Sequence, residues 1–206
     1  EFYVVQQLAN LQMLPPSGAC LLGSIDLTKF VKNPFSDKAE FLWSDYKDTI
    51  AVFTRMLDNV VEFNNLPIQE QRNEILYKRR HGMGFFGLGS MLAMLKIKYG
   101  SEESIKFTEQ ISHILAYQGY LTGVELAKEK GTAPVLEALW EIKPEHERFN
   151  DFAKGNVGKL VKGKELFLHS NYMRRFHDLK LNEDIMKHGC RFTHHSSIAP
   201  TGTISL

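Results

Sequence analysis

Hydroxyl and glycine residues near the end of the chain have the types and spacing to bind a phosphate. Residues 198–206 read IAPTGTISL and follow a strand-like run. Thr201, Thr203 and Ser205 carry hydroxyls that can donate to an anion, and Gly202 lets the backbone approach a ligand closely. Free N–H groups at a helix start also suit a phosphate. The same pattern is typical of a capped turn without a ligand, so spacing alone leaves both interpretations open.

Cys20 is the second candidate for chemistry. The chain contains two cysteines, Cys20 and Cys190, which does not indicate a secreted disulfide scaffold. Cys20 lies in an apolar run, where a cysteine is usually a buried and inert thiol. From the residues alone, we therefore expect a structural side chain at this position.

Two further patterns favour structure over chemistry. His194 and His195 are adjacent, and neighbouring side chains of a strand point to opposite faces, so the pair does not readily share one metal ion. We expect no metal site. The sequence GMGFFG at residues 82–87 has the glycine spacing of a dinucleotide-binding loop, but YKRRH precedes it instead of a buried strand. A dinucleotide site is therefore not expected there.

The composition excludes several classes of function. The 206 residues include 25 Lys and Arg against 24 Asp and Glu, a formal net charge of +1, so neither nucleic acid nor a membrane surface is an expected partner. The hydrophobic content of 43% and the lack of a membrane-length apolar run predict a soluble globular protein. There is no leader-like N-terminus, so we expect a cytoplasmic protein with one domain over residues 1–206.

Long amphipathic helices must position these residues. Apolar side chains at spacings of three and four predict a helix from about residue 44 to residue 64, and start and stop signals at Ser101 and Gly131 predict another. Gly119 and Gly123 inside the second helix indicate close packing. Further helices are predicted at residues 68–78, 91–99, 170–179 and 182–188, and strands near residues 19–27, before Gly82 and at residues 191–198.

Three stretches, in the same order, resemble the large catalytic chain of ribonucleotide reductases, most closely the adenosylcobalamin-dependent class II. They are LPPSGACLLGSIDL at residues 14–27, RRHGMGFFGL at residues 79–88 and IAPTGTISL at residues 198–206. The resemblance covers most of this chain but only a middle-to-late part of a family member. It implies an α/β fold, predominantly helical here, that is a segment of a ten-stranded α/β barrel. The glycines of the middle stretch would permit tight packing between a strand and a helix.

The resemblance also implies an activity and its residues. The family enzymes are oxidoreductases that use a thiyl radical to reduce ribonucleotides for deoxyribonucleotide biosynthesis and DNA replication. Cys20 takes the position of one of two cysteines that reduce the ribose and form a disulfide in each turnover. Its partner lies in earlier strands of the family, and Cys190 does not occupy that position. The substrate phosphates would be bound by Ala199, Pro200, Thr201, Gly202, Thr203 and Ser205.

The sequence departs from the family where the radical chemistry begins. Family members carry the radical cysteine eleven residues before the reducing cysteine and a glutamate two residues after the radical cysteine. Here these positions hold Ala9 and Leu11, which can neither form a thiyl radical nor act as a base. A gap that aligns Asn10 with the asparagine of the family supplies neither group. We therefore expect this chain alone to be inactive and not to bind adenosylcobalamin by itself.

Two alternatives come from other classes of protein. The chain can be a subunit of a split reductase, completed by the rest of the enzyme as a separate chain or a homodimer, with the radical cysteine on that partner. It can also be a non-catalytic helical interaction module that binds no nucleotide. Strands cut from a parallel barrel leave unpaired edges, so we expect the chain to dimerise or to cover those edges with its own helices. The sequence does not distinguish a diphosphate from a triphosphate substrate.

Overall fold

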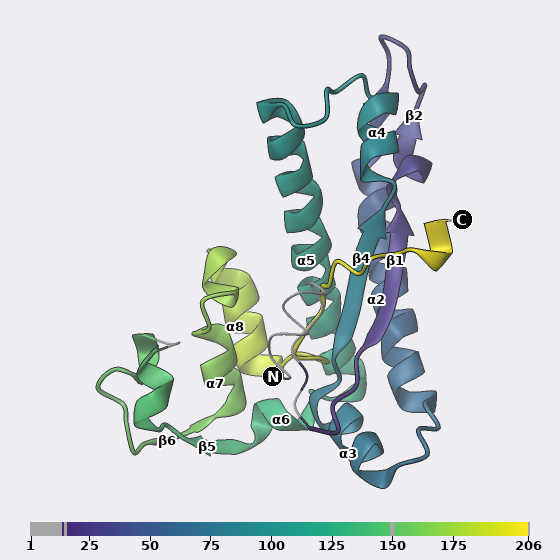
Figure 1. Cartoon of the computed structure of the whole chain (residues 1–206). Coiled ribbons are helices and arrows are strands. Elements are labelled where there is room, and N and C mark those ends of the chain that lie inside the picture. Colours follow the sequence, from purple (N-terminus) through teal and green to yellow (C-terminus); the bar gives the residue numbers. More distant parts are fainter. Residues whose placement is uncertain (1–13, 15, 149–150, 206) are drawn as a thin grey trace.

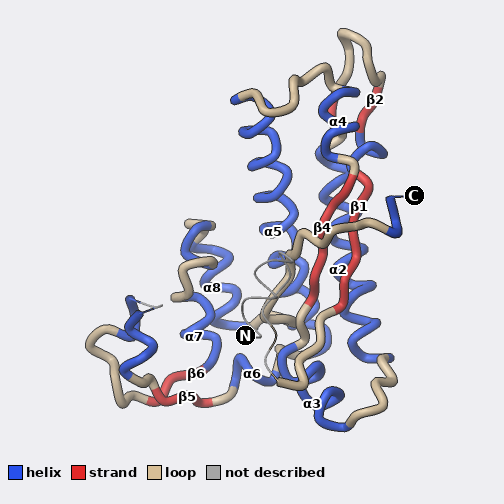
Figure 2. The backbone as a smooth tube through the Cα atoms, viewed as in Figure 1, coloured by secondary structure: helices blue, strands red, loops and turns tan. Residues whose placement is uncertain are grey.

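A pair of parallel strands organises the fold. The computed structural model describes residues 14, 16–148 and 151–205. Strand β1 (Leu21–Asp26) pairs in parallel with β4 (His81–Phe86), and the two strands stay in register along their whole lengths (Figures 1 and 2). Strands joined in parallel through helices confirm the predicted α/β class. The prediction placed the second strand before Gly82, but β4 includes Gly82 and Gly84.

The C-terminal segment, defined here as residues 191–198, lies along the other edge of β4. An isolated parallel bridge forms at Met83, whose N–H donates to His195 O at 2.8 Å, and the His81 N–H donates to His194 O at 2.8 Å. Donors two residues apart on β4 therefore meet acceptors only one residue apart, which makes the ladder irregular. The prediction of a regular strand over this segment was wrong. The segment, and not a helix, covers this edge of β4.

Two long helices, α2 (Trp43–Phe63) and α5 (Glu102–Lys130), flank the strands in Figure 1. Helix α2 lies behind β1 and β4, and α5 lies to the left of β4, with its lower part passing behind the strands. They confirm the two predicted amphipathic helices. The Ser101 hydroxyl accepts from the Ser104 N–H at 3.2 Å at the start of α5, and Gly131 ends the helix at a φ of 88°. Helices and strands together enclose the main core, which includes Ile25, Tyr46, Ile50, Leu57, Met83, Met91, Ile111 and Leu115.

Helix α4 (Leu88–Met94) ends before the predicted position near residue 99. The Lys96 N–H bonds to Ala93 O at 3.0 Å and the Ile97 N–H bonds to Leu92 O at 2.9 Å. With Lys96 at a φ of 61°, these bonds form a Schellman cap in which lysine stands where glycine is usual. No glycine therefore stands at the end of α4, so the sequence did not indicate where this helix ends.

The remaining helices confirm some predictions and correct one. α3 (Gln69–Lys78) and α8 (Leu179–His188) match predicted helices, and α8 ends at Gly189 with a φ of 77°. The prediction of a helix at residues 170–179 was wrong, because a 3-10 turn at Met173–Arg175 takes its place. The other elements are β2 (Val31–Lys32), β3 (Glu40–Phe41), α6 (Pro134–Glu137), β5 (Leu139–Glu141), β6 (Leu160–Lys162) and α7 (Gly163–Leu168).

The two glycines inside α5 allow close packing, as predicted, but the predicted helix packing was wrong about the neighbour. A Cβ on Gly119 would lie 2.2 Å from the His195 ring, and one on Gly123 would lie 2.7 Å from Cys190 Sγ and from the Phe192 ring. The neighbour is the extended chain at residues 190–195 and not another helix. These glycines therefore hold the C-terminal segment between α5 and β4.

A buried carboxylate joins four parts of the chain. Asp58 of α2 has no exposed surface, and its carboxylate lies 2.6 Å from Arg79 Nη2, 3.1 Å from Arg191 Nε and 3.2 Å from Lys130 Nζ. Glu62, one helical turn on, also pairs with Arg79 and Arg191. Arg79 follows α3, Lys130 ends α5 and Arg191 begins the C-terminal segment. The ion pairs therefore fix the ends of these elements to α2.

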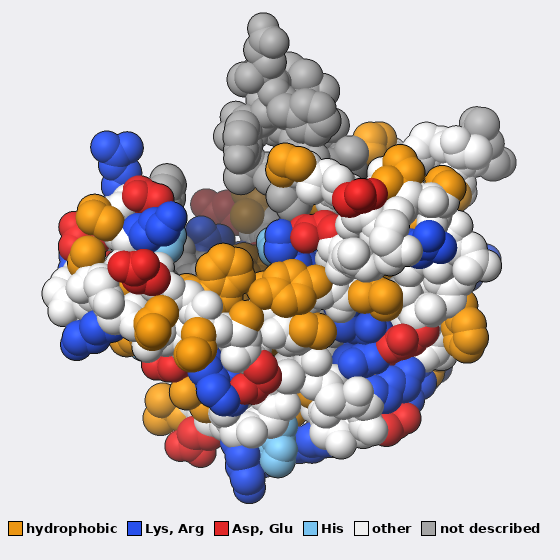
Figure 3. Space-filling view, turned by 90° about the horizontal axis from the view of Figure 1, so that it is seen from below, with side chains coloured by type: hydrophobic (Ala, Val, Ile, Leu, Met, Phe, Trp, Pro, Cys, Tyr) orange, Lys and Arg blue, Asp and Glu red, His pale blue; other side chains and the backbone are white. Residues whose placement is uncertain are grey.

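Apolar side chains also reach the surface. The β5–β6 pair at the foot of Figure 1 exposes Leu139 and Leu160, and Figure 3 shows hydrophobic side chains gathered near the centre of the face seen from below. Exposed leucines of this kind are common on protein surfaces. Among the helices within the described part of the chain, none is both long and apolar enough to span a membrane.

Candidate functional site

One face of the β1–β4 pair carries Cys20, and we call it the thiol face. A Cβ on Gly23 would lie 2.3 Å from the Phe53 ring, so the Gly23 face of β1 packs on α2. Successive residues of a strand alternate between faces, which places Cys20, Leu22 and Ser24 on the opposite side. In Figure 1, α2 and the lower part of α5 lie behind the strands, and no labelled helix covers their front. The thiol face is therefore the side of the strands that these two helices do not cover.

Glycines of β4 lie beside these residues. A Cβ on Gly82 would lie 2.5 Å from Leu22 Cδ2 and 3.0 Å from Cys20 Sγ, and one on Gly84 would lie 3.5 Å from Ser24 Oγ. The sequence places glycine at alternate positions of β4, so the strand adds no side chain to this face at either position. Cys20 and Ser24 are half-buried beside these glycines, and the backbone of Ser197 lies over Gly84.

Cys20 is half-buried at the start of β1, and its thiol keeps its proton at neutral pH. Burial raises the pKa of Cys20 to about 11, and the nearby charge of Arg80 offsets only part of this effect. The Sγ–H donates to Leu21 O at 3.7 Å. A protonated thiol suits a group that gives up hydrogen, whereas a nucleophilic cysteine requires a lowered pKa. The environment therefore favours hydrogen donation over thiolate attack.

Cys190 lies in a different part of the fold. It is fully buried against Gly123 of α5, and Thr132 bonds to both its N–H and its C=O. Burial raises the pKa of its thiol to about 12. Cys190 and Cys20 do not form a disulfide with each other. Cys190 belongs to the packing behind the C-terminal segment and not to the thiol face.

The histidines are also part of the packing. His195 is buried with its Nε2 3.0 Å from Thr54 Oγ1, whereas the adjacent His194 is exposed. Burial lowers the pKa of both His81 and His195 to about 3, so these rings are neutral at physiological pH. The described residues contain no group of three or more His, Cys, Asp or Glu side chains placed to bind a metal ion.

The predicted phosphate-binding residues form an irregular loop after the C-terminal segment. Ala199 and Thr201 are partly buried, while Pro200, Gly202 and Thr203 are exposed, and Thr203–Ser205 is one turn of 3-10 helix. Thr201 has a φ of 54° and donates its hydroxyl to Pro200 O at 2.8 Å. In Figure 1 this part of the chain passes in front of β4 and β1. The loop therefore lies on the same side of the strands as Cys20.

The structure adds residues that the sequence prediction missed. Gly84 allows the C-terminal segment to approach β4, because a Cβ there would lie 2.4 Å from Ser197 O. Ser24 shares the face of Cys20, and the alternation of a strand from Cys20 could have identified it. Ser197 had no such signal, because its position depends on the irregular pairing with β4. Ala9, Asn10 and Leu11, which bear on the missing radical cysteine, lie outside the described residues.

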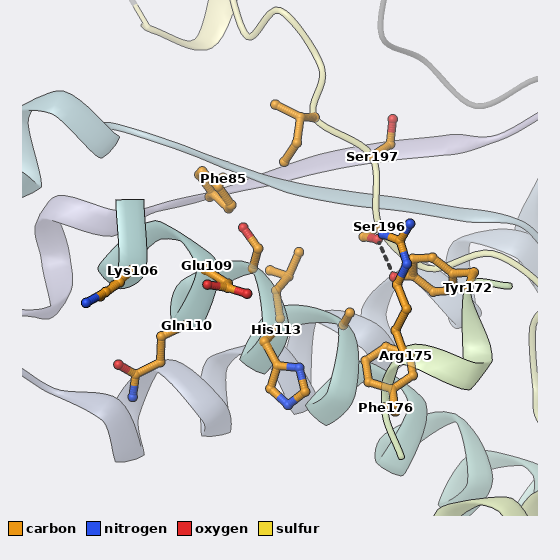
Figure 4. Close-up of a pocket in the computed structure, with 14 residues that line it drawn as sticks. Phe85, Lys106, Glu109, Gln110, His113, Tyr172, Arg175, Phe176, Ser196 and Ser197 are labelled. Atoms are coloured by element: carbon orange, nitrogen blue, oxygen red, sulfur yellow. Dashed lines mark hydrogen bonds between the residues drawn. The ribbon is translucent and has the colours of Figure 1, made fainter. Parts of the chain in front are cut away.

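A cavity of about 1000 Å³ lies on the opposite side of β4 from Cys20. Figure 4 shows it between α5 and the residues that precede α8, with a 3.1 Å hydrogen bond between Tyr172 and Ser196 at one side. Neither Cys20 nor the loop at residues 199–205 lines it. Its lining consists of residues from β4, α5, the stretch before α8 and the C-terminal segment: Phe85, Lys106, Glu109, Gln110, Ser112, His113, Leu115, Ala116, Tyr172, Arg175, Phe176, Ser196, Ser197 and Ile198. We therefore place the candidate site on the thiol face and not in this cavity.

Comparison with known proteins identifies relatives of the chain. The ribonucleoside-diphosphate reductase subunit alpha of Chlamydia pneumoniae is 30% identical over 204 residues, which cover 92% of this chain and 17% of that protein. A vitamin B12-dependent ribonucleoside-diphosphate reductase of Thermoplasma acidophilum is 31% identical over 131 residues, or 63% of this chain and 16% of the relative. The ribonucleoside-diphosphate reductase large subunit of African swine fever virus is 35% identical over 121 residues, which cover 57% of this chain and 14% of that protein.

The chain thus spans about a sixth of the length of these relatives. A protein family also matches nearly the whole of this chain. Residues 10–206 match the family described as ribonucleotide reductase, barrel domain. The parallel strands with helices on one face agree with a part of an α/β barrel. The chain therefore belongs to the ribonucleotide reductase barrel-domain family.

Proposed function

We propose that this chain is a segment of a single catalytic barrel of a ribonucleotide reductase large subunit, in which it supplies one reducing thiol and the substrate-phosphate loop. The observation that carries the proposal is the thiol face, where Cys20 and the loop at residues 199–205 lie on the same side of β1 and β4. A ribonucleotide on this face would extend from the thiol toward the loop.

The proposed role of Cys20 is to give hydrogen to the ribose. With a second cysteine from another part of the enzyme, two thiols supply two protons and two electrons. One ribose C–O bond is replaced by C–H, the hydroxyl leaves as water, and the thiols become a disulfide. The raised pKa of Cys20 supports this role, because the thiol stays protonated until it reacts.

The proposed phosphate site consists of the hydroxyls and backbone of Ala199, Pro200, Thr201, Gly202, Thr203 and Ser205. Exposure of Gly202 and Thr203 supports it, since donors at an exposed loop are accessible to an anion. Hydrogen bonds to a charged group are roughly twice as strong as those between neutral groups. The printed names of the relatives refer to ribonucleoside diphosphates, which makes a diphosphate the first substrate to test.

We propose class II, the adenosylcobalamin-dependent class, for the complete enzyme. One relative is named as vitamin B12-dependent, which supports this assignment. The described residues of this chain do not fit the cofactor, because their cavity of about 1000 Å³ lies behind β4 and does not face Cys20. Residues outside this chain would have to bind adenosylcobalamin, and the proposed chemistry of Cys20 is independent of it.

The proposed partners are a ribonucleotide substrate and the rest of the large subunit, present as a separate chain or as a second copy. The family's radical cysteine and glutamate would come from a separate chain, because Ala9 and Leu11 stand at their positions here and in any second copy of this chain. A non-catalytic interaction module remains the rival function, and it predicts that the chain binds no nucleotide.

The purified chain alone should not make deoxynucleotide. We expect no product above background when it is incubated with cytidine diphosphate, adenosylcobalamin and dithiothreitol, because no residue supplies the thiyl radical. Product is measured by chromatography of the nucleotides. Formation of deoxycytidine diphosphate by this chain, but not by its Cys20→Ser variant, would contradict the proposed need for a partner.

Thr203→Ala and Thr201→Ala should each weaken the binding of cytidine diphosphate by about tenfold, because each removes a donor to a charged phosphate. Titration calorimetry of the purified chain measures the affinity. Thr108→Ala is the matched control, since its hydroxyl bonds to Ser104 O within α5, away from the loop. No binding at millimolar nucleotide, or equal affinity in all variants, would favour the interaction module.

A further inference from the structure

A buried arginine lies beside Cys20 on the thiol face. The parallel register pairs Leu21 with His81, so the residues just before them, Cys20 and Arg80, stand opposite each other on adjacent strands about 4.8 Å apart. Gly82, two residues after Arg80, shares the face of Arg80, and a Cβ on Gly82 would lie 3.0 Å from Cys20 Sγ. The thiol and the arginine are therefore neighbours on one side of the sheet.

The Arg80 guanidinium is removed from water and only partly paired. The residue is 6% exposed, its Nη1 lies 3.1 Å from Glu74 Oε1, and its Nε has no hydrogen-bond partner within the described part of the chain. Glu74 is shared, because Lys78 Nζ lies 2.5 Å from the same carboxylate oxygen. The nearby His194 is neutral at physiological pH. A buried donor without a partner calls for an explanation, and here an excess of positive charge accompanies it.

An adjacent cation stabilises the anionic form of a thiol. Burial raises the pKa of Cys20 and keeps the resting thiol protonated, while the charge of Arg80 acts in the opposite direction. Hydrogen donation uses the protonated thiol, so Arg80 does not assist that step. The arginine therefore suits a different step, in which the Cys20 sulfur carries negative charge.

The proposed function contains such a step. Each turnover would leave Cys20 in a disulfide, which an external dithiol must reduce. One thiolate of the dithiol attacks the sulfur of the partner cysteine, the bond from that sulfur to Cys20 Sγ breaks, and the electron pair goes to Cys20. The second thiol then displaces the partner cysteine and closes a cyclic disulfide, so the dithiol is oxidised and the two cysteines take up its two protons. Exchange is faster when the leaving sulfur is the more stable anion.

We propose that Arg80 is a positioning residue for this reduction, which stabilises Cys20 Sγ as the leaving thiolate and thereby directs the dithiol to the partner sulfur. This inference rests on the proposed function, because it requires Cys20 to enter a disulfide. The resemblance assigned no role to Arg80. Its burial, its place opposite Cys20 and its unused donor carry the inference.

The first test measures the anionic form of Cys20 in the purified chain, by alkylation with iodoacetamide and mass spectrometry of the Cys20 peptide. At about pH 8 the rate follows the fraction of thiolate. Arg80→Gln should react about tenfold more slowly than wild type, the change that accompanies a thiol pKa higher by about one. Arg80→Lys keeps the charge and should react within about twofold of wild type. Arg55→Gln is the matched control, since α2 packs on the other face of β1.

The second test measures Cys20 as a leaving group. Cys20 is joined to glutathione in a mixed disulfide, and dithiothreitol then releases the thiol. Arg80→Gln should slow this release about threefold, since the leaving sulfur is the less stable anion. An unfolded chain would expose Cys20 and react faster, so slower reactions do not come from loss of the fold. Glu74→Gln removes the shared carboxylate and should speed the alkylation while circular dichroism shows the native helix content.

The outcomes separate this inference from the proposed function, because neither reaction uses a nucleotide. A folded Arg80→Gln chain that reacts at the wild-type rate overturns the role of Arg80, and so does a folded Glu74→Gln chain with an unchanged rate. If cytidine diphosphate still binds in those cases, the proposed function stands without Arg80. If the rates change as expected but the chain binds no nucleotide, the effect of Arg80 on Cys20 stands and the proposed function is overturned.

Discussion

Asp58→Asn should lower the free energy of unfolding by about 3–5 kcal/mol, the range for removing one partner from a buried ion pair. Asp58 has no exposed surface, and it accepts bonds from Arg79 at 2.6 Å, Arg191 at 3.1 Å and Lys130 at 3.2 Å. An amide cannot neutralise these cations, and Glu62 is the carboxylate that remains beside the two arginines. Denaturation of the purified chain by urea measures the change.

The matched control is Glu129→Gln, which makes the same chemical change at the surface. Its ion pair with Arg55 at 2.6 Å has side chains that are 51% and 45% exposed, so solvent screens the pair and we expect a much smaller loss of stability than for Asp58→Asn. If Asp58→Asn lowers the free energy of unfolding no more than Glu129→Gln does, the buried cations do not depend on Asp58.

The effect of Asp58→Asn should also depend on pH. Burial raises the pKa of Asp58, but the hydrogen bond and charge of Arg79, together with Arg191 and Lys130, outweigh it and hold the pKa below its ordinary value. The stabilisation is therefore fully present above the pKa of the unfolded state and is lost as the pH falls through the lower pKa of the folded state. The difference in the free energy of unfolding between wild type and Asp58→Asn should therefore narrow as the pH falls through that acid range.

Local signals in the sequence were enough to predict the main helices. The spacing of apolar residues gave α2, and the Ser101 cap and Gly131 gave both ends of α5, because these features act within one helix. The end of α4 was missed because Lys96 adopts the left-handed conformation usually taken by glycine. No pattern in the sequence predicted the ion pairs of Asp58, because its three cationic partners come from distant parts of the chain.

The candidate site was predictable only where a motif carried it. Cys20 and the loop at residues 199–205 were identified by resemblance, and residue types alone gave an inert thiol and an ambiguous turn. The contact between Gly84 and Ser197 joins residues more than a hundred positions apart, so no local pattern reports it. The close approach of Ser197 to Gly84 explains why the glycines of β4 belong to a strand and not to a loop.

Gly84→Ala should move the C-terminal segment off β4 and weaken nucleotide binding. The new Cβ would lie 2.4 Å from Ser197 O, a backbone atom that cannot rotate away as a side chain can. Overpacking of this kind costs about 1–3 kcal/mol of stability. The Ser197 N–H donates to Met83 O at 2.9 Å, and this bond should break first. Hydrogen exchange measured by NMR should show the Ser197 amide losing its protection.

The phosphate loop should respond to the same change, because it begins two residues after Ser197. We expect Gly84→Ala to weaken the binding of cytidine diphosphate at least tenfold, since the loop is displaced. Gly89→Ala is the matched control: no atom lies within 4 Å of its added Cβ, and alanine in a helix is favoured over glycine by about 1 kcal/mol. A Gly84→Ala chain that keeps the protected amide of Ser197 and the wild-type affinity would show that close approach of the segment to β4 does not position the loop.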